Sequence, residues 1–370
     1  MFEALRLGYA ARCVSDSIAS PTTPLAGPSL HASFARQFLV GTCVGGVLPG
    51  SIDASERGLL THQFNVLTPE NCMKPGPIHP APGRFDFTAS DALVRFAEAH
   101  QMPVVGHCLC WHQQSPAWMF EAGIGRQAAL AQLREHIHAV AGRYRGRLLG
   151  WDVVNEAIAD DGDALRDTPA AREIGPDFIE RAFELAREAD PGAELYYNDY
   201  NIELPAKRER TLRMLERLLA SGVRVDGVGI QGHWQMGQVP FDDIRAAIDA
   251  FAGLGLKVMI TELDLDVVDR PDCSADIAVQ RAYSVAEDVY RDGLPGSIAS
   301  QQAAQYARLF QLFGERPGAV TRVSFWGLHD GRSWLNTWPG KRTNHPLLFD
   351  RACRPKPAFD AVLGVAGGVP

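Results

Sequence analysis

The sequence predicts an α/β protein that folds as a single (β/α)8 TIM barrel, on two observations. From residue 38 onward, short apolar runs that end in polar or aromatic residues alternate with segments of helical periodicity, and this unit occurs eight times. The alternation continues to residue 330 without a break in composition. A doubly wound parallel sheet is the alternative architecture, but eight successive units fit one closed barrel better.

Each predicted strand is a short run rich in apolar residues, and the segments between the runs carry apolar residues at helical spacing. We expect the strands at 38–46, 64–71, 103–111, 148–156, 194–201, 227–234, 257–265 and 322–330. We expect helices at 87–100, 127–144, 177–190, 206–221, 241–254 and 299–313. In a barrel of parallel strands the carboxyl ends of the strands meet at one face, where active sites form.

Composition excludes several classes of function. The 370 residues are 46% hydrophobic, which is enough for one large core or two ordinary ones. The formal net charge is −8, and charges of one sign form no long run, so we expect no nucleic-acid partner. No stretch of 18 apolar residues is present, so we expect no membrane-spanning helix and no membrane partner.

The chain divides into two expected parts. Residues 1–30, with Pro21, Pro24 and Pro28, read as a flexible leader, and residues 31–370 read as the catalytic barrel. The leader has no apolar core of the kind found in a secretory signal peptide, so this chain leaves its localisation open.

No motif for a cofactor or a metal is evident. The seven Cys residues form no C-x-x-C pair. The run from Gly227 to Gly232 matches the G-x-G-x-x-G pattern, but it lies within a predicted strand and does not open a helix, so it does not indicate a dinucleotide site. We therefore expect no cofactor and no metal in the site, although calcium in a loop stays open.

The fourth predicted strand closes on Asn155 and Glu156, two groups that an apolar interior would reject. Because this end of the strand lies at the open face of a barrel, Glu156 is the first candidate for a catalytic group. The alternative interpretation is that Glu156 begins the next helix and interacts with the helix dipole.

The seventh predicted strand also ends in a carboxylate, Glu262. Glycoside hydrolysis needs two carboxyl groups: one protonates the leaving oxygen, and the other attacks the anomeric carbon or activates water. The alternative is that Glu262 only forms a local hydrogen-bond network with Thr261 and Asp264.

Groups suited to binding sugars are dense at the other predicted strand ends. A pyranose ring presents apolar C–H faces and a rim of hydroxyls, so aromatic rings and polar groups bind it together. The candidates at these strand ends are Glu70, Asn71, Lys74, His107, Trp111, His112, Gln114, Asn198, Tyr200, Gln231, His233, Trp326, Asp330 and Trp334.

Seven motifs occur between about residue 38 and residue 363. They are Glu-Asn-Cys-Met-Lys-Pro (70–75), His-Cys-Leu-Cys-Trp-His-Gln-Gln-Ser-Pro-Ala-Trp (107–118), Trp-Asp-Val-Val-Asn-Glu (151–156), Gly-Ile-Gln-Gly-His-Trp (229–234), Ile-Thr-Glu-Leu-Asp (260–264), Phe-Trp-Gly-Leu-His-Asp-Gly-Arg-Ser-Trp-Leu (325–335) and Pro-Leu-Leu-Phe-Asp (346–350). In sequence and order they resemble glycoside hydrolase family 10, which consists chiefly of retaining endo-β-1,4-xylanases with one (β/α)8 barrel.

The resemblance implies a role for individual residues. Glu262 would be the nucleophile, Glu156 the general acid and then the general base, and His233 the group that keeps Glu262 ionised and oriented. Asn155 would bind the 2-hydroxyl of the sugar. The remaining substrate contacts would be Glu70, Asn71, Lys74, His107, Trp111, Gln114, Tyr200, Gln231, Trp326 and Trp334.

Three further expectations depend on this resemblance. The negative charge of Glu262 should raise the pKa of Glu156, while His233 should hold the pKa of Glu262 low. The long segment 266–300 should shape the leaving-group subsites, and the stretch 336–345 should reach over the same cleft. Xylan and xylo-oligosaccharides are the expected partners of a monomer, and a polymeric substrate suggests a secreted or periplasmic location.

Two other functions stay open at this point. A barrel with these carboxylates could be an endoglucanase, a mannanase or another β-glycanase of the same architecture. A non-catalytic xylan-binding protein could also use this scaffold, although such proteins usually lose a catalytic carboxylate and both are present here.

Overall fold

The structure of the chain is a computed structural model that describes residues 27–46, 48–162, 165–270, 274–284 and 286–367. Most of the predicted leader, residues 1–26, lies outside the described residues. Its last residue, Leu30, begins the short helix α1 (Leu30–Ser33) and is buried.

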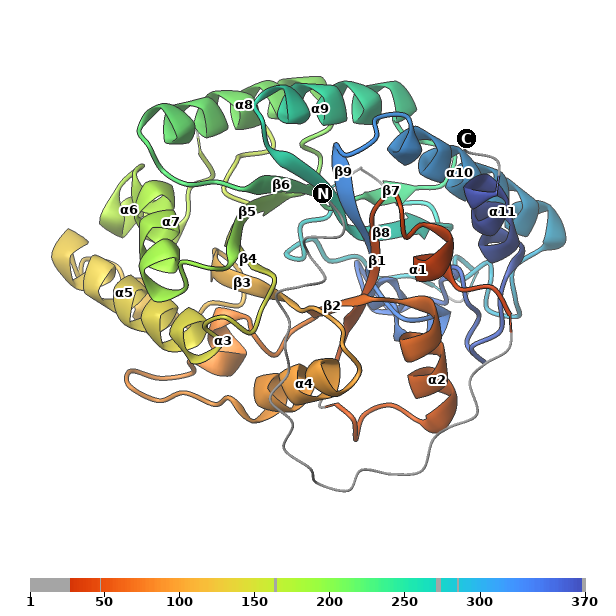
Figure 1. Cartoon of the computed structure of the whole chain (residues 1–370), viewed down its shortest axis with the longest axis horizontal. Helices are drawn as coiled ribbons and strands as arrows, with labels where there is room; N and C mark the ends of the chain where they lie inside the picture. Colours follow the sequence, from red (N-terminus) through yellow and green to blue (C-terminus); the bar gives the residue numbers. More distant parts are fainter. Residues whose placement is uncertain (1–26, 47, 163–164, 271–273, 285, 368–370) are drawn as a thin grey trace.

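Eight parallel strands form the predicted barrel, and the doubly wound alternative is wrong (Figure 1). They follow one another in the order β2-β1-β9-β8-β6-β5-β4-β3, and a parallel bridge between Leu67 and Val104 joins the two ends of this order. The strands are β1 (Leu39–Val44), β2 (Val66–Pro69), β3 (Val105–Trp111), β4 (Gly150–Asn155), β5 (Glu194–Asp199), β6 (Gly227–Ile230), β8 (Lys257–Asp266) and β9 (Val320–Phe325).

Helices surround the strands, and one long helix follows each barrel strand (Figure 1). All six predicted helices are present, with small shifts at their ends. They are α4 (Thr88–Ala99), α5 (Arg126–Arg143), α7 (Phe178–Ala189), α8 (Pro205–Ala220), α9 (Phe241–Gly253) and α10 (Gly296–Gly314). Two further long helices, which the periodicity did not predict, complete the ring as α2 (Ala54–Gln63) and α11 (Pro357–Ala366).

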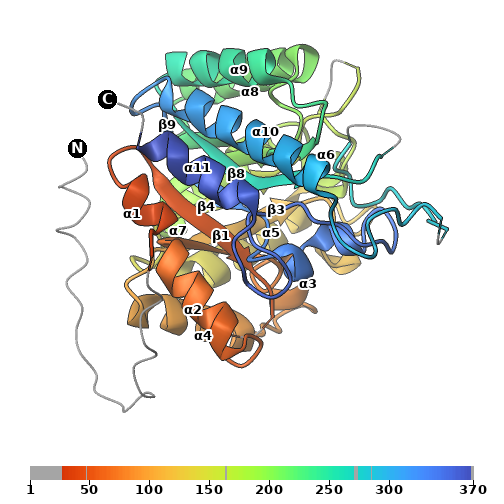
Figure 2. The same ribbon diagram turned by 90° about the vertical axis from the view of Figure 1, so that its right-hand side faces the viewer.

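Short helices lie in the connections between these elements. They are α3 (Pro75–Ile78), α6 (Pro169–Ile174) and the 3-10 turns η2 (Ala117–Phe120), η3 (Asp330–Arg332) and η4 (Trp334–Asn336). In Figure 2 the long connections that follow β8 and β9 lie together at one end of the barrel, on the right of the view.

The sixth predicted strand is interrupted. β6 ends at Ile230, and a separate strand β7 (His233–Gln235) pairs with the far end of β8, where His233 lies opposite Asp264. Gly232 lies between the two strands with a φ of 83°, a left-handed conformation that favours glycine. Gly232 therefore allows the chain to bend between β6 and β7, in line with the strand role expected for this run, and no helix follows the run directly.

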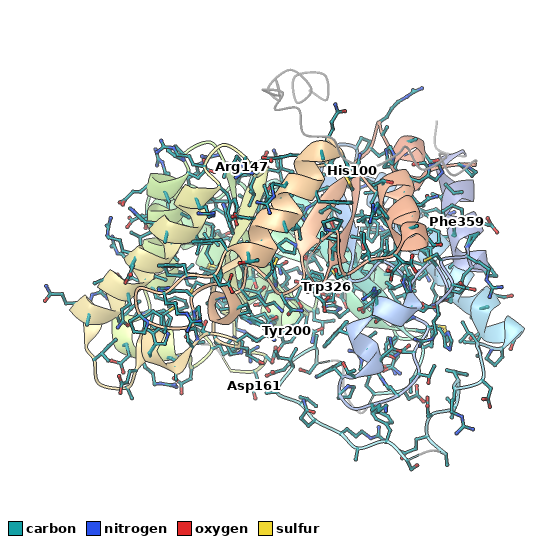
Figure 3. All side chains as sticks on the ribbon, turned by 90° about the horizontal axis from the view of Figure 1, so that it is seen from below. His100, Arg147, Asp161, Tyr200, Trp326 and Phe359 are labelled. Atoms are coloured by element: carbon teal, nitrogen blue, oxygen red, sulfur yellow. The ribbon has the colours of Figure 1, made fainter. Side chains whose placement is uncertain are left out.

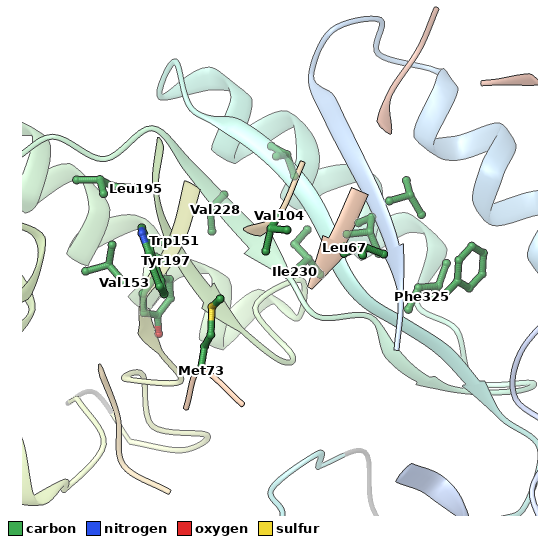
Figure 4. Packing of buried hydrophobic residues seen from close by; sticks show 14 of the residues in the cluster. Leu67, Met73, Val104, Trp151, Val153, Leu195, Tyr197, Val228, Ile230 and Phe325 are labelled. Atoms are coloured by element: carbon green, nitrogen blue, oxygen red, sulfur yellow. The ribbon is translucent and has the colours of Figure 1, made fainter. Parts of the chain in front are cut away.

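The main core lies between the strands and the surrounding helices (Figure 4). A smaller apolar layer fills part of the barrel interior with Val66, Val105, Tyr196 and Met259. Along each strand, side chains alternate between the main core and the barrel interior. The strands end at the open face of the barrel, so the polar residues at their carboxyl ends lie at this face. Within the described part of the chain, no helix is long and apolar enough to cross a membrane.

Candidate active site

Glu156 and Glu262 are both buried. Glu156 follows β4 directly and has a φ of 56°, and the next helix, α6, begins only at Pro169. Glu156 is therefore not in the first turn of a helix, and the interpretation that it interacts with a helix dipole there is wrong. Glu262 lies within β8.

Side-chain amides connect the two carboxyl groups. Asn155 and Gln231 both donate to Oε1 of Glu156, over 3.2 and 2.9 Å. Asn198 donates over 2.7 Å to Oε1 of Glu262 and over 2.9 Å to the side-chain oxygen of Asn155. Strands β4 and β5 place Asn155 and Asn198 in register, so the amide chain is fixed by the sheet.

Glu262 is held by groups that stabilise its charge. Its Oε2 lies 3.2 Å from Nε2 of His233, whose Nδ1 lies 3.0 Å from Asp264. Thr261 donates over 2.6 Å to Asn198, the amide that contacts Glu262. Thr261 and Asp264 thus belong to the network around Glu262, but they act through Asn198 and His233, so a purely local network does not describe the site.

The surroundings shift the pKa values of the two carboxyl groups in opposite directions. Burial, then the negative charge of Asp199, raises the pKa of Glu156 to about 7, and Glu262 adds a smaller effect of the same sign. Burial would also raise the pKa of Glu262, but hydrogen bonding to His233 and the nearby imidazoles lower it below its usual value. Burial opposes the charge of His233 too, yet Asp264 and Glu262 raise the pKa of this imidazole to about 9.

The negative charge of Glu262 raises the pKa of Glu156, as expected, but it accounts for only a minor part of the increase. Asp199, which the sequence did not single out, is the more important charge. Asp199 lies at the end of β5 and is fully buried beside Lys207, whose ammonium is 2.9 Å from its carboxylate.

Residues that follow β2 and lie in β3 form one wall of the site. Lys74 donates over 3.1 Å to Asn71, and its ammonium lies 4.8 Å from the centre of the Trp111 ring. Trp111 also donates its indole N–H to Oε2 of Glu156 over 2.8 Å, so it contacts the carboxyl group itself. The charges of Glu70 and Lys74 interact, and burial raises the pKa of the Glu70 carboxyl.

His107 and Gln114 differ in their placement. His107 is buried, with its Nδ1 2.9 Å from Asp152 and its ring edge-on to Trp326 at 5.3 Å. Gln114 has an exposed side chain and a φ of 50°, and its carbonyl accepts the N–H of Gly76 over 2.7 Å. The structure thus joins the connection after β2 to the one after β3 through the Gln114 backbone.

Aromatic rings form the opposite wall. Trp334 stacks on Trp338 at 4.5 Å and donates its indole N–H to Asp264 over 2.8 Å. Its ring also lies 4.9 Å from that of His233, so this wall adjoins the partner of Glu262. Figure 3 shows Trp326 and Tyr200 in the middle of the molecule as seen from below.

Tyr200 belongs to a group of charged residues near Glu156. Its hydroxyl donates to Asp160 over 2.6 Å and accepts from Arg166 over 2.7 Å, and Lys207 lies over its ring at 3.9 Å. Burial raises the pKa of the Tyr200 hydroxyl well above its usual value.

The long connection after β8 extends to the strands on the other side of the barrel. Asp276 accepts a hydrogen bond from Gln113 and lies 3.5 Å from Arg166, and its carbonyl accepts from Trp338 over 3.2 Å. Residues 336–345 pack on the same connection, because Arg342 binds both Asp266 and Tyr283. Both predicted cleft segments thus lie beside the candidate site, and their role in leaving-group subsites stays a prediction.

Several residues of the network were outside the predicted site. Asn198 stood only among the sugar-binding candidates, although its register with Asn155 would have indicated a contact with the catalytic strand. Asp152 and Asp199 act on other site residues and were not predicted, whereas Asp264 was predicted only as a partner in a local network around Glu262. Within the described ranges, no three His, Cys, Asp or Glu side chains are grouped so as to hold a metal ion.

Comparison with known proteins shows a consistent set of relatives. The profile of Glycosyl hydrolase family 10 matches residues 29–365. The chain is 39% identical over 343 residues to Endo-1,4-beta-xylanase A of Xylanibacter ruminicola, covering 91% of this chain and 93% of that protein.

Solved structures give the same result. A GH10 endoxylanase from a sugarcane soil metagenome superimposes with a TM-score of 0.87 at 38% identity, over 91% of this chain and all of that one. A mutant structure in complex with xylotriose superimposes with a TM-score of 0.82 at 36% identity, over 91% and 99% of the two chains.

Proposed function

Because the chain belongs to glycosyl hydrolase family 10 and is an endo-1,4-β-xylanase, we propose that it cleaves xylan by a retaining double displacement through a covalent glycosyl-enzyme. The observation that supports this mechanism best is a pair of buried carboxyl groups, connected by the Asn155 and Asn198 amides, whose pKa values are shifted in opposite directions. A raised pKa suits a proton donor, and a lowered pKa suits a nucleophile.

In the first half-reaction, a carboxylate oxygen of Glu262 attacks the anomeric carbon while the bond from that carbon to the glycosidic oxygen breaks. Glu156 transfers its proton to this oxygen, so the leaving sugar departs with a hydroxyl group. The product is an ester between Glu262 and the remaining xylo-oligosaccharide. A separation of about 5–5.5 Å between the two carboxyl groups suits direct attack.

In the second half-reaction, water takes the place of the departed sugar. Glu156, now ionised, removes a proton from the water as its oxygen attacks the anomeric carbon, and the ester bond to Glu262 breaks. Glu262 leaves as a carboxylate and Glu156 ends protonated, which restores the enzyme. Two inversions at the anomeric carbon give net retention.

Neighbouring residues would orient these two groups. His233 and Asn198 contact both carboxylate oxygens of Glu262, so its charge and orientation are set before substrate binds. We assign Asn155 to the sugar 2-hydroxyl, because its amide lies between the two carboxyl groups. Gln231 and Trp111 contact Glu156 in the structure, so we propose that they orient the acid as well as border the sugar.

The remaining wall residues would recognise the sugar rings. We propose that Glu70, Asn71, Lys74, His107 and Gln114 bind the sugar hydroxyls on the side of the covalent ester. Trp326 and Trp334 would pack against the xylose rings and leave no room for the hydroxymethyl group of glucose. Tyr200 would line the site beside Glu156. Action as a monomer, without cofactor or metal, stays a prediction.

The experiment that tests the function is a time course of products from unbranched β-1,4-xylan. The wild type should give a ladder of short xylo-oligosaccharides, and Glu262→Ala should give none. Glu156→Ala should retain activity on substrates with good leaving groups, and azide should raise that activity because this anion attacks the glycosyl-enzyme in place of water and needs no general base. If the wild type cleaves glucan or mannan but not xylan, another β-glycanase activity is correct; if it cleaves none, the scaffold only binds.

A further inference from the structure

The backbone around Glu156 has an unusual conformation that neighbouring groups must maintain. A φ of 56° is uncommon for a residue with a side chain and costs on the order of 1–3 kcal/mol. The N–H of Glu156 donates to the carbonyl of Asn198 over 2.9 Å, and its carbonyl accepts from Nε of Arg166 over 3.2 Å. These contacts fix the peptide groups on both sides of the residue.

The next two peptide groups are held by one hydroxyl. The N–H groups of Ala157 and Ile158 both donate to the Tyr197 oxygen, each over 3.1 Å. Tyr197 lies in β5 and is fully buried in the apolar layer outside the barrel, as Figure 4 shows. Its hydroxyl therefore contacts the turn after β4 from the side opposite to Asn198 and the barrel interior.

Asp199 fixes the hydrogen of this hydroxyl. Tyr197 donates to its Oδ2 over 2.5 Å, so both lone pairs of the phenolic oxygen are free to accept the two backbone N–H groups. Asp199 also receives the N–H of Ile158 over 3.4 Å and that of Tyr200 over 2.9 Å. The ammonium of Lys207 balances its charge at 2.9 Å.

We propose that Tyr197 and Asp199 are positioning residues that hold the turn after β4, and thereby Glu156, in place for proton transfer. This inference depends on the proposed role of Glu156 as the acid and base. Removal of the phenolic hydroxyl would leave the N–H of Ala157 unpaired and that of Ile158 with only its long contact to Asp199, and buried unpaired donors drive the backbone to rearrange. A displacement of about 1 Å at a catalytic group is enough to lower a rate by about 100-fold.

The test is the leaving-group dependence of Tyr197→Phe, which keeps the buried ring and removes only the hydroxyl. Glycosylation of xylotetraose needs the proton of Glu156, whereas glycosylation by 2,4-dinitrophenyl xylobioside does not, because the phenolate leaves unaided. We expect kcat/KM to fall about tenfold or more on xylotetraose and less than about twofold on the dinitrophenyl substrate. Azide should raise kcat on the second substrate.

Tyr196→Phe is the matched control. It changes the adjacent tyrosine of the same strand, which is also buried and whose hydroxyl donates to Glu194 over 2.9 Å. This variant should lose a hydrogen bond without altering the ratio of the two kcat/KM values. Asp199→Asn provides a second variant, expected to show the same selective loss, should Tyr197→Phe not fold. Because it also removes the charge that raises the pKa of Glu156, its rates are compared with those of the wild type at a pH below the basic limb of both enzymes.

Equal losses on both substrates, or an unchanged rate on xylotetraose, would overturn the proposal. Failure of the proposed function itself would look different, because then the wild type would cleave neither substrate, or Glu156→Ala would show no selective loss and no response to azide.

Discussion

At the scale of single residues, two glutamates with the same side chain receive opposite protonation states from their surroundings. Both are buried, so burial alone would raise both pKa values. Glu262 is an exception because a protonated His233 and the Asn198 amide stabilise its charge. Glu156 instead lies near Asp199, whose charge adds to the effect of burial.

This difference predicts a bell-shaped pH dependence of kcat/KM. In the proposed mechanism Glu156 acts first in its protonated form, so activity should fall as the pH rises through about 7. Glu262 acts as an anion, so activity should also fall as the pH drops through its pKa, which lies below the usual 4.5. Initial rates on xylotetraose across this range measure both limbs. A basic limb near the ordinary pKa of a glutamate would contradict the assignment.

The sequence singled out both glutamates because each follows an apolar run in a predicted strand, and a carboxylate in an apolar interior is costly without a function. It did not identify Asp199 or Tyr197, because their importance depends on how side chains of β5 meet each other and the backbone of the turn after β4. The sequence also indicated the wrong main charge behind the raised pKa of Glu156, because it pointed to Glu262 and not to Asp199. In the proposed mechanism the charge of Asp199 remains after Glu262 is esterified, so the pKa of Glu156 should fall only in part during the cycle.

At the scale of elements, the close spacing of the strands around the site requires a glycine, Gly229, in β6. A Cβ atom on Gly229 of β6 would lie 2.3 Å from Oδ1 of Asn198 and 2.6 Å from Cγ2 of Thr261. Neither neighbour can yield without moving the amide that contacts Glu262. Gly229 therefore permits the close approach of β5, β6 and β8.

Gly229→Ala should accordingly lower kcat/KM at least about tenfold and destabilise the protein by about 1–3 kcal/mol, as overpacking does. Urea unfolding and xylotetraose kinetics measure the two effects. Gly364→Ala is the control, because a Cβ at this position in α11 meets no atom within 4 Å. It should stabilise the protein by up to about 1 kcal/mol with no change in activity. Wild-type activity of Gly229→Ala would refute this account.

Periodicity predicted six of the eight long helices and missed α2 and α11. In α2 the buried apolar residues Leu59 and Leu60 are adjacent instead of spaced over several turns. The start of this helix was visible in a different signal, the capping box of Asp53 and Glu56. The break after Ile230 was not predicted, because the whole run 227–234 has strand character and only the φ of Gly232 divides it.

At the scale of the whole molecule, a cluster of buried charged residues joins the long connection after β8 to the one after β9. Asp266, at the end of β8, is fully buried with Arg342 and accepts a hydrogen bond over 2.6 Å from Asn344. Arg342 also contacts Tyr283 in the connection after β8. This cluster thus supports the segment that bears the Trp334 and Trp338 wall.

Asp266→Ala should leave the Arg342 charge buried and unpaired, at a cost of about 3–5 kcal/mol in the free energy of unfolding. The KM for xylotetraose should rise, because the aromatic wall loses its support. Urea unfolding gives the first quantity and steady-state kinetics the second. Glu315→Ala, which breaks a solvent-exposed pair with Arg245, should change neither noticeably. Similar stability of the two variants would contradict this role for Asp266.

The closed barrel was predictable because its evidence is repeated eight times along the chain. The contacts of Asp276 with Gln113 and Arg166 were not, since they connect segments far apart in sequence and depend on the path of a long loop. The sequence indicated only that this loop belongs near the cleft.

The central claim, that Glu262 forms a covalent intermediate while Glu156 transfers protons, is tested most directly by trapping that intermediate. An activated 2-deoxy-2-fluoroxylobioside slows the second half-reaction, so mass spectrometry of the intact protein should show one added fluoroxylobiosyl group. Peptide mapping should place it on Glu262. Failure to form an adduct while the wild type hydrolyses xylan, or an adduct on another residue, would contradict the account.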